Sequence, residues 1–323
     1  MAVSWDTGAQ IRLDLMDAFV EAAAPQTMYR AVFSPLPVPA RVGSIKVAPF
    51  SSIATAPTTI TRTPNTEYAE AALTLTSVLY ECSDVGLQMS MDLAEQYPLN
   101  MEMAAAQTLK YKLEGAAEAA AVDVLFNATT GAVRDANGNI GPVTTPWNDT
   151  SSTPLVDIAA AIEVLAQNSG GLVPDTLVVS SAAFAALKQH PDIVSRVPIT
   201  VLRSDEEVAN ALAPVFGLQR IVVSRVMQGS TPVYPVDTAL LAITAPANSL
   251  ESTPAACRLV YWADDGDISR EGWVVESYDK IETRSHIIRA RRNAGYLVIS
   301  ANGLCGMTGV IGEPEDPDPG VVP

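Results

Sequence analysis

The chain has 323 residues, 48 % of them hydrophobic and 17 % charged, which is enough to bury one large core or two ordinary ones. Its formal charge of −16 at pH 7 argues against a general nucleic-acid coat, because phosphate binding needs clustered Lys and Arg. Two His and three Cys argue against a His-rich metal site and against a disulfide framework, and the Cys are expected to be buried free thiols.

The sequence is expected to lack targeting and membrane segments. No basic stretch precedes an apolar run in the first 19 residues, so they do not resemble a signal peptide. The most apolar window, 207–226, is interrupted by Asn210, Pro214 and Arg220 and is too polar to span a membrane. We therefore expect a protein that has no membrane contact and is made in a reducing cytoplasm.

Residues 1–40 are predicted to contain one short helix followed by an extended arm. Apolar side chains recur at roughly helical spacing within 8–23. Four prolines follow between 25 and 39, and this density excludes a packed helix or a central strand there.

Residues 41–80 are predicted to form a long β-ribbon. They are rich in Thr, Ser, Val and Ile, the segments 41–50 and 58–63 favour strands, and 73–80 alternates in polarity. Because a ribbon of this kind is not stable alone, it must lie on another surface.

The net charge changes sign within this region. Residues 22–66 contain no acid and four bases, among them Arg41, Lys46 and Arg62, whereas 67–149 contain twelve acids and three bases. We expect the basic ribbon to meet acidic residues, within one chain or between copies. The acids considered for contacts between subunits are Glu102, Glu114 and Glu118.

Residues 98–126 carry the strongest helix pattern, with Leu109, Leu113 and Ala117 on one stripe. At 1.5 Å per residue this helix is about 43 Å long, so we expect a spine that crosses a domain. Gly, Asn, Thr and Pro dominate residues 127–153, where Asn137-Gly138 predicts a hairpin turn.

Helix and strand patterns alternate over the next ninety residues and predict a compact α/β unit. Ser180 or Ser181 is placed to cap the second helix, and Gly217 to end the third. The expected helices are 154–167, 181–189 and 205–215, and the expected strands are 176–179, 219–225 and 238–244.

The last third is predicted to be rich in strands and to end in a tail. Gly303, Gly306 and Gly309 predict a loop, and the Gly, Pro, Asp and Glu from 312 onward predict a flexible acidic tail. The expected strands are 258–263, 272–280, 285–291 and 295–300.

Single residues that could carry chemistry are few. The sequence has no Walker motif, no dinucleotide-binding glycine motif and no nucleophile elbow. His190 and His286 are candidates for a general base or a metal ligand, but neither has a nearby Cys or second His, so structural roles are favoured. Asp264, Asp265 and Asp267 fit a turn better than a calcium loop.

The densest basic run lies near the C-terminal strands, where Arg289 and Arg291 share one strand face. Because the protein is acidic, these arginines are expected to pair with acids of the same or a neighbouring chain rather than with DNA. They complete the set of candidates for contacts between subunits.

The order of these elements resembles the major capsid protein of tailed bacteriophages with the Hong Kong 97-type fold, which is an α+β fold. The resemblance covers most of residues 40–300 and is carried by order and spacing rather than by one motif. The most similar segments are 172–197 (LVPDTLVVSSAAFAALKQHPDIVSRV), 212–225 (LAPVFGLQRIVVSR) and 278–299 (YDKIETRSHIIRARRNAGYLVI).

The resemblance implies a structural protein that assembles into hexamers and pentamers of an icosahedral shell around double-stranded DNA. It implies no enzymatic activity, cofactor or metal site, and a location in the virion capsid after assembly in the bacterial host cytoplasm. The implied parts are an N-terminal arm (1–40), an E-loop (41–80), a peripheral P-domain (81–153 and 266–292) with spine helix 98–126, an axial A-domain (154–265 and 293–311) and a flexible acidic tail (312–323).

The resemblance also implies partners. A separate scaffolding protein is expected because the ribbon begins near residue 41 and leaves no room for a built-in scaffold, and a portal and a decoration protein are further candidates. The acidic wall should repel packaged DNA rather than bind it. Lys46 is the only ribbon Lys, and no crosslinking Asn or acid is identified, so covalent crosslinking is not expected.

Two alternatives remain open from the sequence. An encapsulin-like cellular compartment has the same fold and needs a cargo protein. An acidic hydrolase with paired carboxylates predicts a small oligomer and a pocket of perturbed carboxylates.

Overall fold

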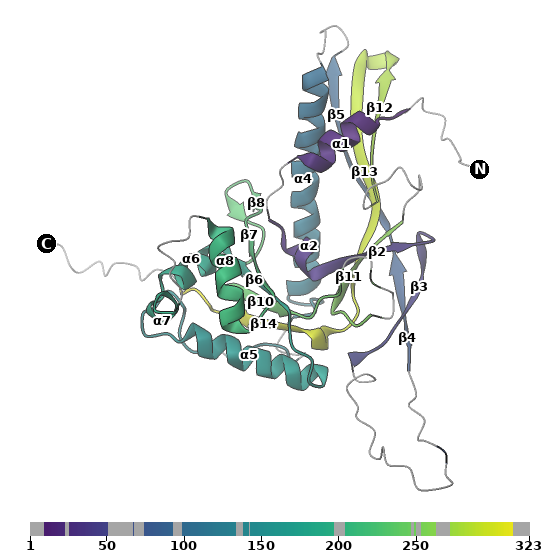
Figure 1. Ribbon diagram of the computed structural model, residues 1–323. Coiled ribbons are helices and arrows are strands. Elements are labelled where there is room, and N and C mark those ends of the chain that lie inside the picture. Colours follow the sequence, from purple (N-terminus) through teal and green to yellow (C-terminus); the bar gives the residue numbers. More distant parts are fainter. Residues whose placement is uncertain are drawn as a thin grey trace, which may run out of the picture.

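The computed structural model shows a tall unit of long strands and one long helix, with an α/β unit beside its base (Figure 1). A two-stranded ribbon extends from the junction of the two units (Figure 1). The structure describes residues 10–22, 26–50, 67, 74–92, 99–133, 138–141, 143–196, 204–246, 249, 253–262 and 272–312.

A six-stranded sheet organises the tall unit. The path is β1-β12-β13-β11-β2, and β5 pairs with the other edge of β13. All pairs are antiparallel except β2–β11. The strands are β1 (Gln10–Ile11), β2 (Phe33–Val38), β5 (Ser83–Asp92), β11 (Cys257–Trp262), β12 (Trp273–Lys280) and β13 (Ser285–Val298).

Strand β13 runs without interruption where the sequence predicted two strands, 285–291 and 295–300. Asn293 and Ala294 lie at the expected break, yet both are buried, and each pairs with β11 on one side and β5 on the other. Neighbours on both edges hold this stretch in the sheet, although its own propensity for strand is low.

The proline-rich segment is built into the subunit, which corrects the expectation that it excludes a packed helix. Residues 28–32 form α2 (Met28–Val32), and Met28 and Val32 are fully buried. Strand β2 then lies at the edge of the sheet. Pro35 and Pro37 are two positions apart in β2, so their backbone nitrogens share one side of the strand. On the side that faces away from β11, no strand accepts a hydrogen bond, so the missing N–H groups of proline cost nothing there.

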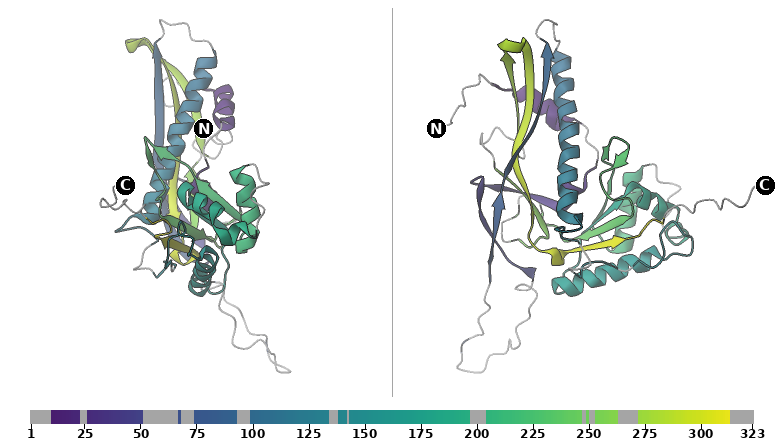
Figure 2. Two further views of the ribbon diagram at one scale, coloured as in Figure 1. Left: turned by 90° about the vertical axis from the view of Figure 1, so that its left-hand side faces the viewer. Right: turned by 180° about the vertical axis from the view of Figure 1, so that it is seen from behind.

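The long helix α4 (Leu99–Phe126) confirms the helix predicted over 98–126 and lies along the sheet (Figure 2). Leu109 and Leu113 are buried against α1 (Leu13–Glu21), β12 and β13. Lys110 donates from Nζ to the carbonyl oxygens of Val20 and Ala22 at 2.7 and 2.6 Å. This cation satisfies backbone acceptors at the C-terminal end of α1, where the helix dipole favours positive charge.

The ribbon consists of β3 (Val42–Val47) and β4 (Thr76–Glu81), paired antiparallel. Its inner face, with Ile45, Val47 and Tyr80, packs on Leu36 and Val38 of β2. The strand predicted over 58–63 lies outside the described residues.

The α/β unit contains a four-stranded sheet in the order β14-β10-β6-β7, with β6 and β7 parallel. Helices α5, α6 and α8 cover one face with a buried apolar core. The strands are β6 (Thr176–Ser180), β7 (Arg220–Ser224), β10 (Thr238–Ala242) and β14 (Leu304–Thr308), and a small hairpin is formed by β8 (Met227–Gln228) and β9 (Thr231–Pro232). The helices are α5 (Pro154–Ser169), α6 (Ser181–Gln189), α7 (Pro191–Val194) and α8 (Asp205–Leu212), followed by a 3-10 turn, η3 (Ala213–Phe216).

The predicted roles of Ser180 and Gly217 at helix ends are confirmed, and α8 begins with a capping box that was not predicted. Ser180 accepts the backbone N–H of Ala183 at 3.0 Å and caps α6. Ser204 and Glu207 form a capping box at the start of α8. Gly217, with φ 73°, ends η3 in the left-handed region.

Several expected boundaries differ in the structure. Strand β11 and residues 293–298 belong to the six-stranded sheet, although the sequence placed them in the α/β unit. The hairpin expected around Asn137-Gly138 lies partly outside the described residues, and nearby Ile140 makes a parallel bridge to Gly306. Gly306 lies within β14 rather than in a loop. Glycine is needed there because a Cβ at this position would overlap the side chain of Val133. Of the predicted tail, 312–323, only Gly312 is described, and its N–H donates to Oδ1 of Asn148 at 3.0 Å.

Candidate assembly surfaces and the buried charge network

A carboxylate buried at the centre of the molecule joins its two units. Glu118 of α4 accepts the backbone N–H groups of Met28 and Tyr29 at 2.8 and 2.9 Å, and so caps the start of α2. It also accepts the hydroxyl of Ser224, at the end of β7, at 2.7 Å. Glu118 is 0 % exposed, so three donors from two other elements replace its lost hydration.

One turn earlier, Glu114 forms the second part of this network. It accepts the Tyr29 hydroxyl at 2.5 Å and an Arg30 guanidinium N–H at 2.6 Å. Buried Arg292 from β13 lies over the rings of Trp273 and Tyr29, 4.4 and 5.7 Å from their centroids. The network therefore connects α2, α4, β7, β12 and β13.

These surroundings move the pKa values of the two carboxyls in opposite directions. Burial raises the pKa of Glu118 in spite of the hydrogen bonds that it accepts. Burial acts on Glu114 in the same sense, but the hydrogen bonds and charge of Arg30, with the Tyr29 hydroxyl, hold its pKa below the ordinary value. Glu114 therefore remains ionised to lower pH in the folded state than in the unfolded chain.

Glu114→Gln is expected to reduce the dependence of the free energy of unfolding on pH in the acid range. The folded pKa of Glu114 lies below its unfolded value of 4.5, so its contribution is present above that pH and is lost as pH falls through the folded value. Urea unfolding of the isolated subunit between pH 3 and pH 7 measures this difference. Equal slopes for the variant and the natural chain on the acid side would contradict the assignment.

Burial of these two residues corrects their assignment as contacts between subunits. Glu114 and Glu118 are 0 % exposed and their partners belong to the same chain, so a neighbouring subunit cannot reach them. The sequence already indicated that Glu114 and Glu118 are not on an exposed face. Each acid follows a residue of the buried stripe of α4, Leu113 or Ala117, by one position and so lies beside that stripe. Acids four residues apart on such a stripe indicate internal partners.

Three other candidates are partly engaged within the subunit. Arg289 and Arg291 both donate from Nε to the same oxygen of Glu276, each at 2.8 Å, which confirms that they share one face. Glu102 accepts from Arg12 at 3.1 Å and lies 3.3 Å from Nε2 of His286. The side chains of Arg289 and Arg291 remain 33 % and 20 % exposed.

The outer face of the ribbon is exposed. Arg41, directly before β3, donates from Nε to the Cys82 carbonyl oxygen at 2.9 Å, and Lys46 of β3 is exposed. Val42 and Leu79 on this outer face are 64 % and 80 % exposed. Arg62 lies outside the described residues. The outer face of the ribbon therefore presents Lys46 together with two exposed apolar side chains.

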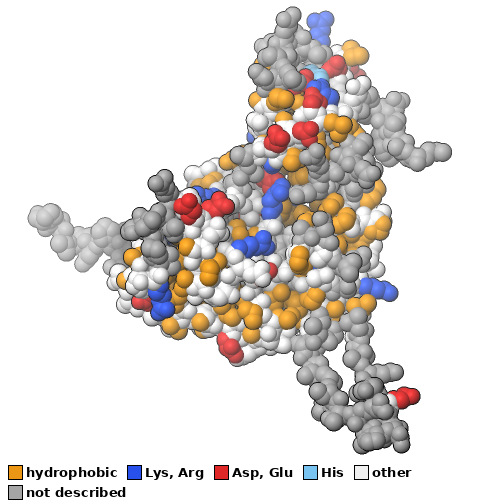
Figure 3. Space-filling view, viewed as in Figure 1, with side chains coloured by type: hydrophobic (Ala, Val, Ile, Leu, Met, Phe, Trp, Pro, Cys, Tyr) orange, Lys and Arg blue, Asp and Glu red, His pale blue; other side chains and the backbone are white. Residues whose placement is uncertain are grey.

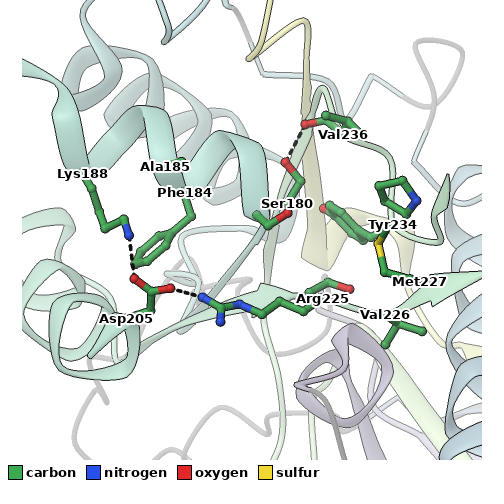
Figure 4. A pocket seen from close by; sticks show the side chains of 13 residues that line it. Ser180, Phe184, Ala185, Lys188, Asp205, Arg225, Val226, Met227, Tyr234 and Val236 are labelled. Carbon is green, nitrogen blue, oxygen red and sulfur yellow. Dashed lines mark hydrogen bonds and ion pairs between the residues drawn. The ribbon is translucent and has the colours of Figure 1, made fainter. Parts of the chain in front are cut away.

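The α/β unit has a pocket of about 410 Å³ between α6 and the β8–β9 hairpin (Figure 4). Asp205 at its rim accepts from Lys188 at 2.6 Å and also pairs with Arg225. Hydrogen bonds from these two cations lower the pKa of Asp205. The three charged side chains that line the pocket are thus paired with one another in a structural cluster.

The two histidines that were candidates for a general base or a metal ligand contact polar groups of the same subunit. Buried His190 contacts the Ser152 hydroxyl through Nε2 at 3.1 Å, and that hydroxyl donates to the Asp149 carbonyl oxygen. His286 contacts Asp279 through Nδ1 at 2.6 Å. The acidic run 264–267 lies outside the described residues. Within the described ranges, no cluster of three metal-ligating side chains occurs.

Comparison with protein families decides the identity. A family model described as phage capsid protein matches residues 89–305, which is more than half of the chain. This chain belongs to the phage capsid protein family. No curated protein matches it. The capsid protein therefore has a structural role, and the hydrolase interpretation is set aside.

Solved structures share the fold of the capsid protein at low sequence identity. A phage-related protein from Bordetella bronchiseptica RB50 is 15 % identical with a TM-score of 0.68, and the match covers 93 % of this chain and 97 % of that one. A virus-like particle from Pyrococcus furiosus gives 10 % identity, a TM-score of 0.54 and coverages of 91 % and 95 %. A structure from Mycobacterium phage Bobi is 14 % identical with a TM-score of 0.52, and the match covers 90 % of this chain and 92 % of that one.

Surface composition of the capsid protein agrees with a role in assembly. Hydrophobic side chains are spread over the visible face of the α/β unit with few charged ones between them (Figure 3). Within the described helices, none is long and apolar enough to cross a membrane. Membership of the phage capsid protein family makes this chain a self-assembling virion protein, and its structure mixes helices and strands.

Proposed function

We propose that this capsid protein forms hexamers and pentamers that close into an icosahedral shell around the double-stranded DNA of a tailed phage. The observation that carries the proposal is the family match over residues 89–305, which includes α4, strands β11, β12 and β13 and most of the α/β unit. The low charge content and the exposed outer face of the ribbon support large contacts between copies.

We assign the parts of the shell subunit by the resemblance to tailed-phage capsid proteins. The ribbon over 41–80 acts as an E-loop, α4 is the spine of the P-domain, and the α/β unit is the A-domain near the symmetry axes. Residues 1–40 act as an N-terminal arm. Arg41, Lys46 and Arg62 on the ribbon, and Glu102, Arg289 and Arg291 on the tall unit, contact neighbouring subunits.

The partners of the shell are proposed from the family role. A separate scaffolding protein directs assembly in the host cytoplasm, a portal occupies one vertex, and a decoration protein binds the outer surface. The net charge of −16 favours a wall that encloses DNA without binding it specifically.

Electron microscopy and light scattering of the purified chain, with and without a candidate scaffold, test this proposal. We expect closed shells or rings of five and six subunits. A monomer or dimer under every condition would contradict the proposal.

A second candidate is an encapsulin-like compartment, which the likeness to the virus-like particle from Pyrococcus furiosus favours. Shell contents separate the two: packaged double-stranded DNA in particles from infected cells supports the phage shell, and a co-purifying cargo protein with no DNA supports the compartment.

A further inference from the structure

The pocket of the α/β unit lies at one edge of its four-stranded sheet. Ser180 ends β6 and Ser224 ends β7, and both residues line the pocket together with Val236, which shortly precedes β10. Because β6 and β7 are parallel, their carboxyl ends share this edge, which is where open α/β sheets bind ligands. The volume of about 410 Å³ is in the range of about 300–1,000 Å³ that is usual for ligand pockets.

The chain leaves the sheet at this same edge. Strand β14 is antiparallel to β10, and its last residue pairs with the first residue of β10. The N–H of Val310 then donates to the carbonyl oxygen of Asp237 at 3.0 Å, and Asp237 directly follows Val236 of the pocket wall. The segment that continues from Gly312 therefore begins close to the pocket.

One end of the pocket has a positive net charge, although the whole chain has a formal charge of −16. Lys188 and Arg225 share the single carboxylate of Asp205, so one positive charge is left over (Figure 4). The side chain of Arg225 is 47 % exposed and is open to a further partner. This end of the pocket therefore favours an acidic ligand.

The other end of the pocket is apolar. Met227, Tyr234 and Val236 lie there, on the far side from Lys188 (Figure 4). Met227 and Val236 are 52 % and 40 % exposed. Covering such side chains stabilises a complex by about 25 cal/mol for each Å² of apolar surface removed from water. A ligand that carries both acids and apolar groups thus fits the pocket best.

Residues 313–323, here called the acidic segment, have this composition in the sequence EPEDPDPGVVP. Four of the first six residues are acids, and the segment contains no base. Prolines stand between the acids and favour an extended chain, which at about 3.1 Å per residue reaches about 34 Å. Because proline has little backbone freedom to lose, docking of such a segment has a low entropic cost.

We propose that the acidic segment binds in this pocket of the same chain. Its acids pair with Arg225 and Lys188. Its prolines cover Met227 and Val236. The pocket is thus a binding site for an acidic, proline-rich peptide, and the chain carries that peptide itself. Attachment next to the pocket gives the segment a high effective concentration, so a weak contact is enough to keep the site occupied. The contact forms within one unassembled subunit and does not depend on shell formation.

Hydrogen exchange of residues 225–236 in the unassembled subunit tests the contact. Neutralising the segment should speed their exchange about tenfold at low salt, because the acids no longer hold it over the β8–β9 hairpin. The substitutions are Glu315→Gln, Asp316→Asn and Asp318→Asn. The matched control neutralises three exposed acids outside the pocket and should leave exchange unchanged: Glu81→Gln, Asp84→Asn and Glu163→Gln. Unchanged exchange in the segment variant, or an equal change in the control, would overturn the proposal.

Charge exchange identifies the cation that holds the segment. Arg225→Glu changes the net charge of the pocket side chains from +1 to −1 and should also speed exchange about tenfold. Slow exchange should return when the same chain carries Lys in place of the acids at 315, 316 and 318, because the two charges then attract again. Arg196→Glu, at an exposed position of the same unit outside the pocket, is the control. No recovery in the combined variant, or an equal effect of the control, would overturn the pairing with Arg225.

Dilution of the subunit distinguishes the same chain from a second copy. Exchange within one chain should not depend on protein concentration. Exchange of residues 225–236 that becomes faster on dilution would place the segment in the pocket of another copy and overturn the assignment to the same chain.

Discussion

Glu118→Ala is expected to lower the free energy of unfolding of the subunit by about 3–5 kcal/mol, as for removal of one partner from a buried polar cluster. The substitution leaves the N–H groups of Met28 and Tyr29 and the hydroxyl of Ser224 without their acceptor in a site closed to water. It also removes the contact through which α4 holds both α2 and β7. Chemical denaturation of the isolated subunit at pH 7 measures the loss.

Two further variants make this test specific. Glu118→Gln keeps one acceptor oxygen in nearly the same volume, so it should lose less stability than the alanine variant. Glu163→Ala removes an exposed carboxylate whose partner is Gln167, four residues along the same helix, and should change stability by less than about 0.5 kcal/mol. A loss of that small size for Glu118→Ala would show that α2 does not depend on this cap.

Replacing residues 51–73 by a short Gly/Ser linker is expected to abolish shell formation while the subunit still folds. The replacement leaves the paired strands β3 and β4 unchanged. It also retains Phe50, which is buried in the core of the α/β unit. Folding should therefore survive, because the described cores remain complete. Assembly should fail, because the variant lacks the tip of the ribbon that is proposed to contact a neighbouring subunit.

Far-UV circular dichroism and thermal unfolding check the fold of this linker variant, and electron microscopy checks its assembly. A linker of the original length and of Gly/Ser composition serves as the control that separates the loss of side chains from the loss of reach. Closed shells of normal diameter from either linker variant would show that the ribbon tip is not needed for closure.

Local chemistry explains why much of the α/β unit could be predicted from the sequence. Ser180 caps α6, Ser204 begins α8 and Gly217 ends the turn after α8, and each acts on backbone groups within a few residues of itself. The Ala-rich helix α4 likewise follows from residues that are adjacent in the chain. The family resemblance could also be recognised from the sequence, because it depends on the order in which these elements follow one another.

Long-range contacts explain what could not be predicted. Helix spacing places Glu114 and Glu118 beside the buried stripe of α4, but their partners lie 84 to 106 residues away in the chain, so the sequence could not identify the groups that they contact. The continuity of β13 through Asn293 depends on strands from two other regions. Burial and pairing across such separations are properties of the folded core, whereas helix caps, charge segregation and element order are already present in the chain.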